Sequence, residues 1–145
     1  LCQAISAQWA KVGIKAKLRT FPFATYFPMI QRYEASAYLL GWSVPTFDAY
    51  YSLQALIRSP GGGGDGNFNL GRASNPQQDA MIERVKTETD LKLRNQLIEK
   101  VLLNEHQAIS HIPLFNLITP WAASKQVQIP TRADNYIDWR VLKVN

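Results

Sequence analysis

Hydrophobic residues recur every three or four positions in several parts of the chain, which is the spacing of one helical face. In the first part the series runs from Cys2 through Trp9, and Gly13 follows as a left-handed helix stop. Pro28 requires the second helix to start near it or to bend. The pattern predicts helices over residues 2–12, 23–33 and 49–57, one from residue 76, and a longer one from residue 90 to 109.

Polar residues stand where three of these helices begin. Asp48 precedes the helix over 49–57, and Asn75 precedes Pro76, a residue favoured at the first helical position. Asp90 stands in the same place before the longest helix. We therefore expect Asp48 and Asn75 to be structural caps, with side-chain oxygens that accept backbone N–H groups.

Other segments have the pattern of strands. Residues 14–20 alternate apolar and basic positions, as in a strand with one face in water, whereas residues 36–42 form an unbroken apolar run typical of a strand buried on both faces. Residues 112–118 predict another strand, with Pro113 at its beginning. Residues 121–128 and 137–144 look extended, with a polar turn around 131–135 between them. Helices and strands together predict a mixed α/β fold with a largely buried sheet.

The stretch "SPGGGGDGNFNLGRASNP" is rich in turn-forming residues. It contains G-x-G-x-x-G at Gly61, Gly63 and Gly66, but a dinucleotide site needs a strand before this motif and a helix directly after it. Here a helix precedes and "NFNLG" follows. The stretch therefore predicts a surface loop.

Composition limits the protein to one core. The 145 residues are 46% hydrophobic, which suffices for one domain or a piece of a larger one, and no apolar run approaches the roughly 20 residues of a membrane helix. The chain does not begin with Met, so we expect a longer polypeptide. The single cysteine cannot form an internal disulfide. The net charge of +5 is spread along the chain, apart from a group at Lys11, Lys15, Lys17 and Arg19. The last three alternate with apolar residues, which indicates a solvated strand face rather than a nucleic-acid patch.

The sequence offers no catalytic or metal-binding constellation. His106 and His111 are five residues apart, a spacing that does not place both imidazoles on one helical face, and no Cys or carboxylate completes a metal set. The chain has no G-x-S-x-G nucleophile motif. We therefore predict that the protein is not an enzyme and holds no cofactor or metal.

An aromatic corner follows the predicted strand over 36–42. A buried strand of an α/β sheet often ends at a ligand crevice, and the indole of Trp42 offers a large apolar face with one N–H. The alternative is that Trp42, Phe47, Tyr50 and Tyr51 are core residues of the following helix. The pattern alone leaves both interpretations open.

Three stretches, in this order, resemble a known family: "LLGWSVPTFDAYYSLQAL", "NFNLGRASNPQQDAMIERVKTETDLKLRNQLIEKV", which contains Arg94, and "HIPLFNLITPWA". Together they resemble the last third of the extracytoplasmic solute-binding proteins of ABC importers. The class is bacterial extracellular solute-binding family 5, which binds peptides, oligopeptides or nickel.

The resemblance implies one lobe of a type II periplasmic-binding-protein clamshell, an α/β fold with a mixed sheet flanked by helices. Residues 1–125 are then a C-terminal lobe truncated at its N-terminus, and residues 126–145 cross back to the missing lobe. The implied partners are a small solute or peptide and ABC permease subunits, in the periplasm or another extracytoplasmic space, with no nucleic acid. We expect the isolated fragment to self-associate through the surface that the other lobe covers.

The resemblance also implies a ligand site at the Gly-Trp corner. Peptide-binding relatives commonly carry an Asp three residues after the Trp, which pairs with the ligand's amino group, but this chain has Pro45 there. A ligand without a free α-amino group, stacked on Trp42, is the resulting prediction. The predicted ligand-binding residues are Gly41, Trp42, Ser43, Pro45, Phe47, Asn69, Phe115 and Asn116.

Two other classes remain open from sequence. The chain is alternatively part of a hydrolytic or transferase enzyme whose catalytic residues lie upstream. An interaction or nucleic-acid-binding module, based on the charge of +5, would bind polyanions with a steep salt dependence.

Overall fold

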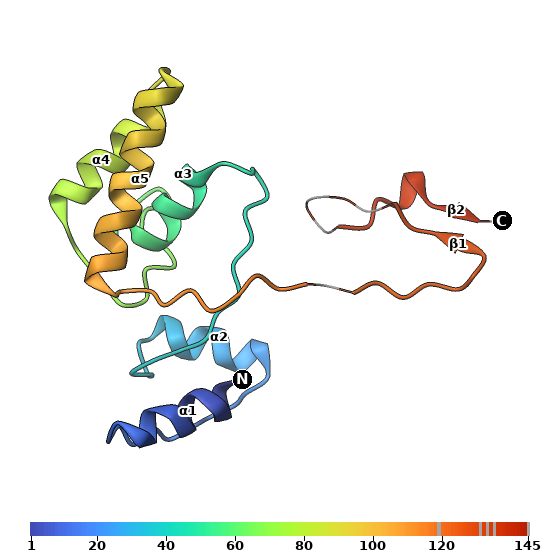
Figure 1. Cartoon of the computed structure of the whole chain (residues 1–145), viewed down its shortest axis with the longest axis horizontal. Helices are drawn as coiled ribbons and strands as arrows, with labels where there is room; N and C mark the ends of the chain where they lie inside the picture. The colour runs from blue at the N-terminus through green and yellow to red at the C-terminus, as the bar shows by residue number, and fades with distance from the viewer. Residues whose placement is uncertain (119, 131, 133, 135, 145) are drawn as a thin grey trace.

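The computed structural model describes residues 1–118, 120–130, 132, 134 and 136–144. Helices α3, α4 and α5 form one group, α1 and α2 lie beside it, and the C-terminal segment extends away from both (Figure 1). The elements in chain order are α1 (Cys2–Lys11), α2 (Phe23–Gln31), α3 (Ala49–Ser52), the π-helical η1 (Leu53–Ile57), α4 (Pro76–Thr87), α5 (Leu91–Ala108), β1 (Val127–Gln128), the 3₁₀ turn η2 (Trp139–Val141) and β2 (Lys143–Val144).

The main core lies between α4, α5 and the helical segment α3–η1. α4 and α5 pack side by side as a helical hairpin (Figure 1). Their contact buries apolar side chains from one face of each helix, as the predicted stripes require. The fully buried residues are Leu53, Ile82, Val85 and Val101.

A second, smaller core connects α2 to the loop after η1. Met29 and Ile30 of α2 pack against Leu70, and α2 continues through Pro28 to its end at Gln31. The backbone N–H of Arg32 donates to the carbonyl oxygen of Pro28 at 3.1 Å. The helices predicted over 2–12 and 23–33 are thus confirmed, each with an earlier end.

Side-chain caps fix the starts of α3, α4 and α5. The carboxylate of Asp48 accepts the backbone N–H of Tyr50 at 2.8 Å. Asn75 accepts two backbone N–H groups at the start of α4, and Asp90 does the same at the start of α5. These bonds satisfy donors that the first turn of a helix leaves without an intrahelical acceptor.

The glycine-containing loop folds back on η1. The backbone N–H of Gly66 donates to the carbonyl of Gln54 at 2.8 Å, and that of Phe68 donates to the carbonyl of Ala55 at 2.9 Å. The side-chain amide of Gln54 donates to Asp65 at 2.9 Å. The predicted loop is therefore confirmed, and its backbone supplies donors to carbonyls of the neighbouring π-helix.

Residues 36–42 do not form the predicted strand buried on both faces, and the first two of them lie in a bend. Tyr38, Leu40 and Trp42 are half-buried and the residues between them are exposed, so one face is covered. The hydroxyl of Tyr26 bonds both backbone groups of Leu39, donating to its carbonyl at 2.8 Å. Within the described ranges no strand pairs with this segment, and a β ladder requires a neighbouring strand.

The strands predicted over 14–20 and 112–118 also have no β partner among the described residues. Leu117 and Ile118 are largely exposed. In the C-terminal segment β1 and β2 pair antiparallel, so the extended regions over 121–128 and 137–144 are confirmed in part. Residues 131, 133 and 135 of the predicted turn lie outside the described residues. The larger mixed sheet stays a prediction.

Of the helices in the described part of the chain, none is long and apolar enough to cross a bilayer.

Candidate functional site

The chain changes direction at the corner, defined here as residues 41–48, between the extended segment and α3. Gly41, Ser43, Pro45 and Phe47 are exposed, whereas Trp42 is half-buried. Exposure alternates along residues 38–44, as in an extended chain, which explains the difference between Trp42 and its neighbours Gly41 and Ser43, whereas Pro45 and Phe47 belong to the turn that follows. The predicted ligand residues of the corner therefore lie on two faces, four of them toward solvent.

Trp42 packs against α3 and the glycine-containing loop. Its indole N–H donates to the hydroxyl of Ser52 at 3.0 Å. Its ring stacks on Tyr51 with centroids 5.5 Å apart and meets Phe68 edge-on at 5.0 Å. These contacts agree with the alternative in which Trp42 packs with the following helix, and its N–H already has an acceptor in the protein.

Phe47 is the aromatic residue of the corner that faces water. The residue is 67% exposed, and its backbone is in the left-handed region at φ 53°. A turn holds it, because its backbone N–H donates to the carbonyl of Val44 at 3.1 Å. The corner thus presents one large apolar side chain to solvent.

Asp48 joins the corner to α5. Arg94 donates through Nη2 to both carboxylate oxygens of Asp48, at 2.7 and 3.0 Å. The hydrogen bond from Arg94 is the largest cause that holds the pKa of Asp48 below its ordinary value, and the hydrogen bond from the backbone N–H of Tyr50 is the second. The carboxylate is therefore charged at neutral pH and already has two donors.

Arg94 is itself held by α4. Its Nε donates to the carbonyl of Val85 at 3.0 Å, near the end of that helix. Its side chain is mostly buried, and its carboxylate partner is more exposed. Sequence reasoning noted Arg94 as part of the family pattern and missed its partner, because 46 residues separate it from Asp48 along the chain.

Asn69 has a different role from the predicted polar contact with ligand. The side chain is 2% exposed, and its amide nitrogen donates to the carbonyls of Arg58 and Ala73 at 3.0 and 2.8 Å. Its side-chain oxygen accepts the backbone N–H of Ala73. Asn69 therefore stabilises the loop, because its polar atoms bond the backbone on both sides of it.

Phe115 and Asn116 are exposed on the segment that leaves the end of α5. This segment, residues 112–118, runs from the base of α5 toward the C-terminal arm (Figure 1). Exposed apolar side chains follow one another along it, which is unusual without a covering partner. The large ones are Ile112, Leu114, Phe115, Leu117 and Ile118.

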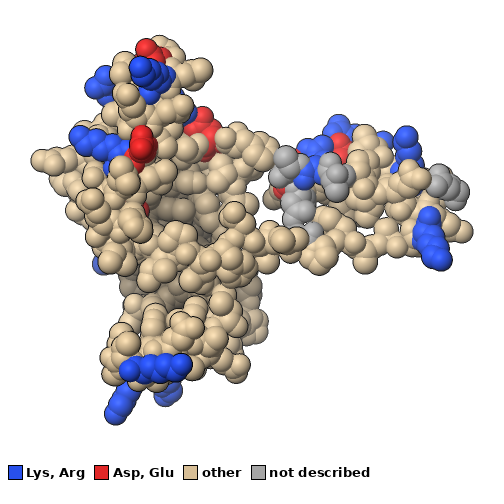
Figure 2. Space-filling view, in the orientation of Figure 1, with Lys and Arg blue, Asp and Glu red and all other residues tan. Residues whose placement is uncertain are grey.

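Charged side chains gather away from the middle of the face drawn in Figure 2. They stand at the far end of the α4–α5 hairpin, at the opposite end of the body near the N-terminal helices, and on the C-terminal arm, while a broad uncharged area lies between (Figure 2). Lys15, Lys17 and Arg19 are exposed, but so are Ile14 and Leu18 beside them, so the predicted strand with one solvated face stays a prediction. The basic residues thus form no single continuous stripe on this face.

Titratable groups outside the corner form local pairs. His111 contacts a carboxylate oxygen of Glu105 at 2.6 Å just after α5 ends. In the C-terminal arm, Arg132 lowers the pKa of Asp134 to about 2 through a side-chain hydrogen bond. Across the residues that the structure describes, no three His, Cys, Asp or Glu side chains gather closely enough to hold a metal ion.

Two curated proteins are similar to this chain. Heme-binding protein A of Haemophilus influenzae is 28% identical over 114 residues, which are 79% of this chain and 20% of that protein. Di/tripeptide-binding protein 1 of Pseudomonas aeruginosa is 29% identical over 128 residues, which are 88% of this chain and 22% of that protein. No protein-family model and no solved structure matches the chain. The chain spans about a fifth of the length of these curated relatives, and both are named for what they bind.

Proposed function

We propose that this chain is part of the extracytoplasmic solute-binding component of an ABC importer. The observation that carries the proposal is the similarity, over 79% and 88% of the chain, to one protein named for binding heme and another named for binding di- and tripeptides. The competing enzymatic interpretation has no support from either relative. In the proposed protein, residues 1–125 belong to one lobe of a clamshell and residues 126–145 reach back to the other lobe.

The exposed side of the corner is the proposed contact with ligand in this lobe. Gly41, Ser43, Pro45 and Phe47 face outward there, and Gly41 has open space around its α-carbon. Backbone at Gly41 and Ser43 is therefore accessible to a polar ligand group, and Phe47 to an apolar one. Phe115 and Asn116 on the exposed segment after α5 are proposed as further contacts when the lobes close.

The corner is poorly suited to a ligand ammonium group. Burial of an unpaired charge costs several kcal/mol, and Pro45 supplies no carboxylate. Asp48 is already engaged by Arg94 and by the backbone N–H of Tyr50. The proposed ligand is therefore a peptide-like or other small solute without a free α-amino group at this position.

Calorimetric titration of the complete natural polypeptide that contains these residues tests the proposal. The panel consists of heme, di- and tripeptides with free amines, and the same peptides with acetylated amines. We expect at least one member to bind, with acetylated peptides bound no more weakly than free ones. A panel without any binder overturns the proposed function. A strong preference for free amines that Asp48→Asn abolishes would instead make Asp48 the amine-binding residue.

A comparison of the 145-residue chain with the complete polypeptide tests the two-lobe part of the proposal. Clefts of this kind bury most of a ligand's surface between two walls, so one wall alone binds weakly. We expect the isolated chain to bind the same solute at least about tenfold more weakly. Equal affinities would show that the site needs only one lobe.

A further inference from the structure

We infer that Phe47 is the ligand-contacting aromatic residue of the corner and that Arg94 is its positioning residue, acting through Asp48. The inference rests on the proposed binding function and assigns the specificity of that site. The ring that contacts the ligand is then that of Phe47, and not that of Trp42 as the sequence predicted. The ligand group that Phe47 would contact is apolar and planar, such as an aromatic side chain or the face of a conjugated ring.

Exposure separates Phe47 from the other aromatic residues nearby. Trp42 and Tyr50 are half-buried, and Tyr51 is covered on one side by the ring of Trp42. Phe47 is 67% exposed, so most of its ring area is in water. A hydrophobic ring in this position gains the most when a ligand removes it from water.

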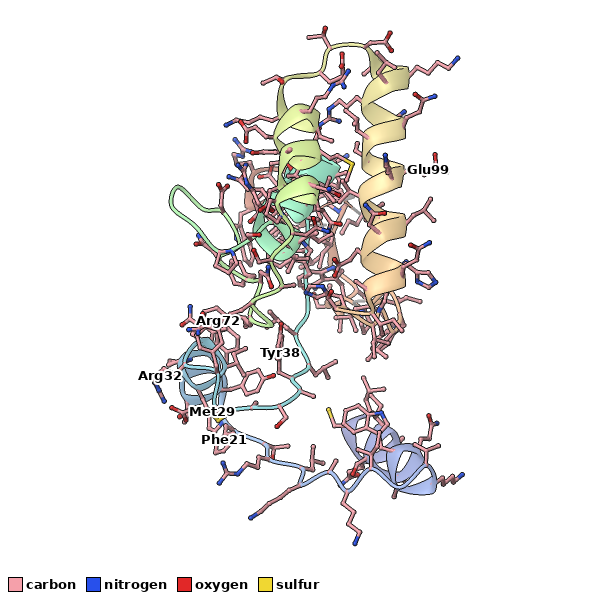
Figure 3. The ribbon with its side chains drawn as sticks, turned by 90° about the vertical axis from the view of Figure 1, so that its left-hand side faces the viewer. Phe21, Met29, Arg32, Tyr38, Arg72 and Glu99 are labelled. Carbon is pink, nitrogen blue, oxygen red and sulfur yellow. The ribbon has the colours of Figure 1, made fainter. Side chains whose placement is uncertain are left out.

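Backbone conformation also distinguishes Phe47. Four non-glycine residues in the described ranges have positive φ: Tyr33, Phe47, Arg72 and Ile109. Ile109 ends α5 as its left-handed C-cap. The guanidinium carbon of Arg72, near α2 in Figure 3, lies 3.5 Å from the ring centroid of Tyr33, so these two residues stack on each other.

Phe47 has neither of these structural explanations. It ends no long helix, and its ring faces solvent. A bulky residue in the left-handed region costs roughly 1 kcal/mol or more, and such residues persist where the surrounding structure holds them and cluster at ligand and active sites. The strained backbone turns a phenylalanine ring outward instead of into the adjacent core.

Arg94 holds this conformation from the side of α5. It donates to both oxygens of Asp48, while its Nε is fixed by the carbonyl of Val85. The backbone N–H of Asp48 donates to the hydroxyl of Thr46, which closes the turn on the other side of Phe47. Because Asp48 directly follows Phe47, restraint of Asp48 restrains the direction in which the Phe47 ring points.

A double-mutant cycle in the complete polypeptide tests both assignments. The probes are heme and N-acetylated dipeptides that carry either a phenylalanine or an alanine side chain. We expect Phe47→Ala to weaken binding of heme or the phenylalanine peptide about tenfold or more. Phe23→Ala removes an aromatic ring of nearly the same exposure, 68%, from α2 and should change affinity less than about twofold.

Arg94→Met supplies the second arm of the cycle. Alone it should weaken binding about three- to tenfold, and in the Phe47→Ala background it should have almost no further effect, because a positioning residue acts through its target. Arg94→Lys should restore part of the affinity. Losses from Arg94→Met and Phe47→Ala that simply multiply would overturn the positioning role.

Phe47→Gly is the control for a folding defect, because it removes the ring and also relieves the strained φ. Its melting temperature should equal or exceed that of the wild type while its affinity falls as in Phe47→Ala. If the wild type binds a probe and Phe47→Ala binds it equally well, the assignment of Phe47 is wrong and the proposed function stands. If the wild type binds no probe, the proposed function fails, and this inference fails with it.

Discussion

The α3–α5 group and the extended segments use the same kinds of residues in opposite ways. In the α3–α5 group the apolar stripes meet one another, and Leu53, Ile82, Val85 and Val101 are completely or almost completely buried. In residues 112–118 comparable side chains point into solvent. The two regions therefore differ in the partners available within this chain, not in hydrophobicity.

The difference shows how helices and strands depend on context. A helix closes its backbone hydrogen bonds within itself, so two helices and a short connection suffice for a core. The backbone N–H and C=O groups of a strand bond to a neighbouring strand. An extended segment without a neighbouring strand is therefore stabilised only by individual contacts with side chains. Tyr26, which bonds both backbone groups of Leu39, is one such contact.

The largest expected effect is in the main core. Ile82→Ala removes three carbon atoms from a fully buried side chain and should lower the free energy of unfolding of the 145-residue chain by about 2–5 kcal/mol. Denaturant unfolding followed by circular dichroism measures it. The control Leu103→Ala, on the exposed side of α5, should change stability by less than about 0.5 kcal/mol. Equal losses for both variants would contradict the core described here.

The next effect concerns the glycine-containing loop. Gly66 has φ +61°, and a β-carbon there would lie 2.6 Å from the carbonyl oxygen of Arg58 and 2.7 Å from the backbone of Pro60. Gly66→Ala should therefore lower the free energy of unfolding by about 1–3 kcal/mol. Gly62→Ala, in the same loop with open space around it, is the matched control and should be nearly neutral. A neutral Gly66→Ala would show that the loop rearranges freely.

A smaller effect follows from the ion pair at the corner. Because the folded pKa of Asp48 is lowered, its charge stabilises the fold above the ordinary pKa of about 3.9, and this contribution disappears as pH falls through the folded pKa. Asp48→Asn keeps a capping side chain, and the carboxylate is partly exposed, so we expect a loss below about 1 kcal/mol at pH 7.

Unfolding measured at pH 7 and at a series of lower pH values checks the sign. The difference between wild type and Asp48→Asn should shrink as the pH falls through the folded pKa of Asp48. A difference that grows in acid would mean that Asp48 stabilises the fold in its protonated form.

The smallest expected effect lies in the exposed segment. Ile118 is 87% exposed, so Ile118→Thr should change the stability of the 145-residue chain by less than about 0.5 kcal/mol. In the complete polypeptide the same substitution should cost at least about 1 kcal/mol if another part of the protein covers this segment. Thermal melts of both forms make the comparison. Equal, negligible effects in both would mean that Ile118 stays in solvent.

Sequence reasoning predicted the features whose signals are local. The caps at Asn75 and Asp90, the stop at Gly13 and the stripes of α4 and α5 each depend on residues a few positions apart. It missed features that depend on distant partners. Whether an apolar run such as 36–42 becomes a strand depends on what lies beside it, and the run itself does not encode its neighbour.

The corner shows the same limit at the level of single residues. An aromatic cluster is visible in the sequence, but the direction of each ring follows from the backbone. Trp42 lies on the covered side of the alternating residues 38–44 and points toward Ser52, whereas Phe47 lies after a turn, at positive φ, and is exposed. The charge on Arg94 is visible too, whereas its pairing with Asp48 required the packing of α5 beside α3.

The hydrogen bonds from Gly66 and Phe68 to the carbonyls of η1 limit how the loop can change in evolution. A stretch with four consecutive glycines looks tolerant of insertions and deletions, and surface loops usually are. Here the backbone N–H groups of Gly66 and Phe68 must reach fixed positions beside η1. A change of loop length between residues 58 and 66 would therefore leave the carbonyls of Gln54 and Ala55 without their hydrogen-bond donors. Insertions among homologues should therefore avoid these residues and occur instead on the far side of Phe68.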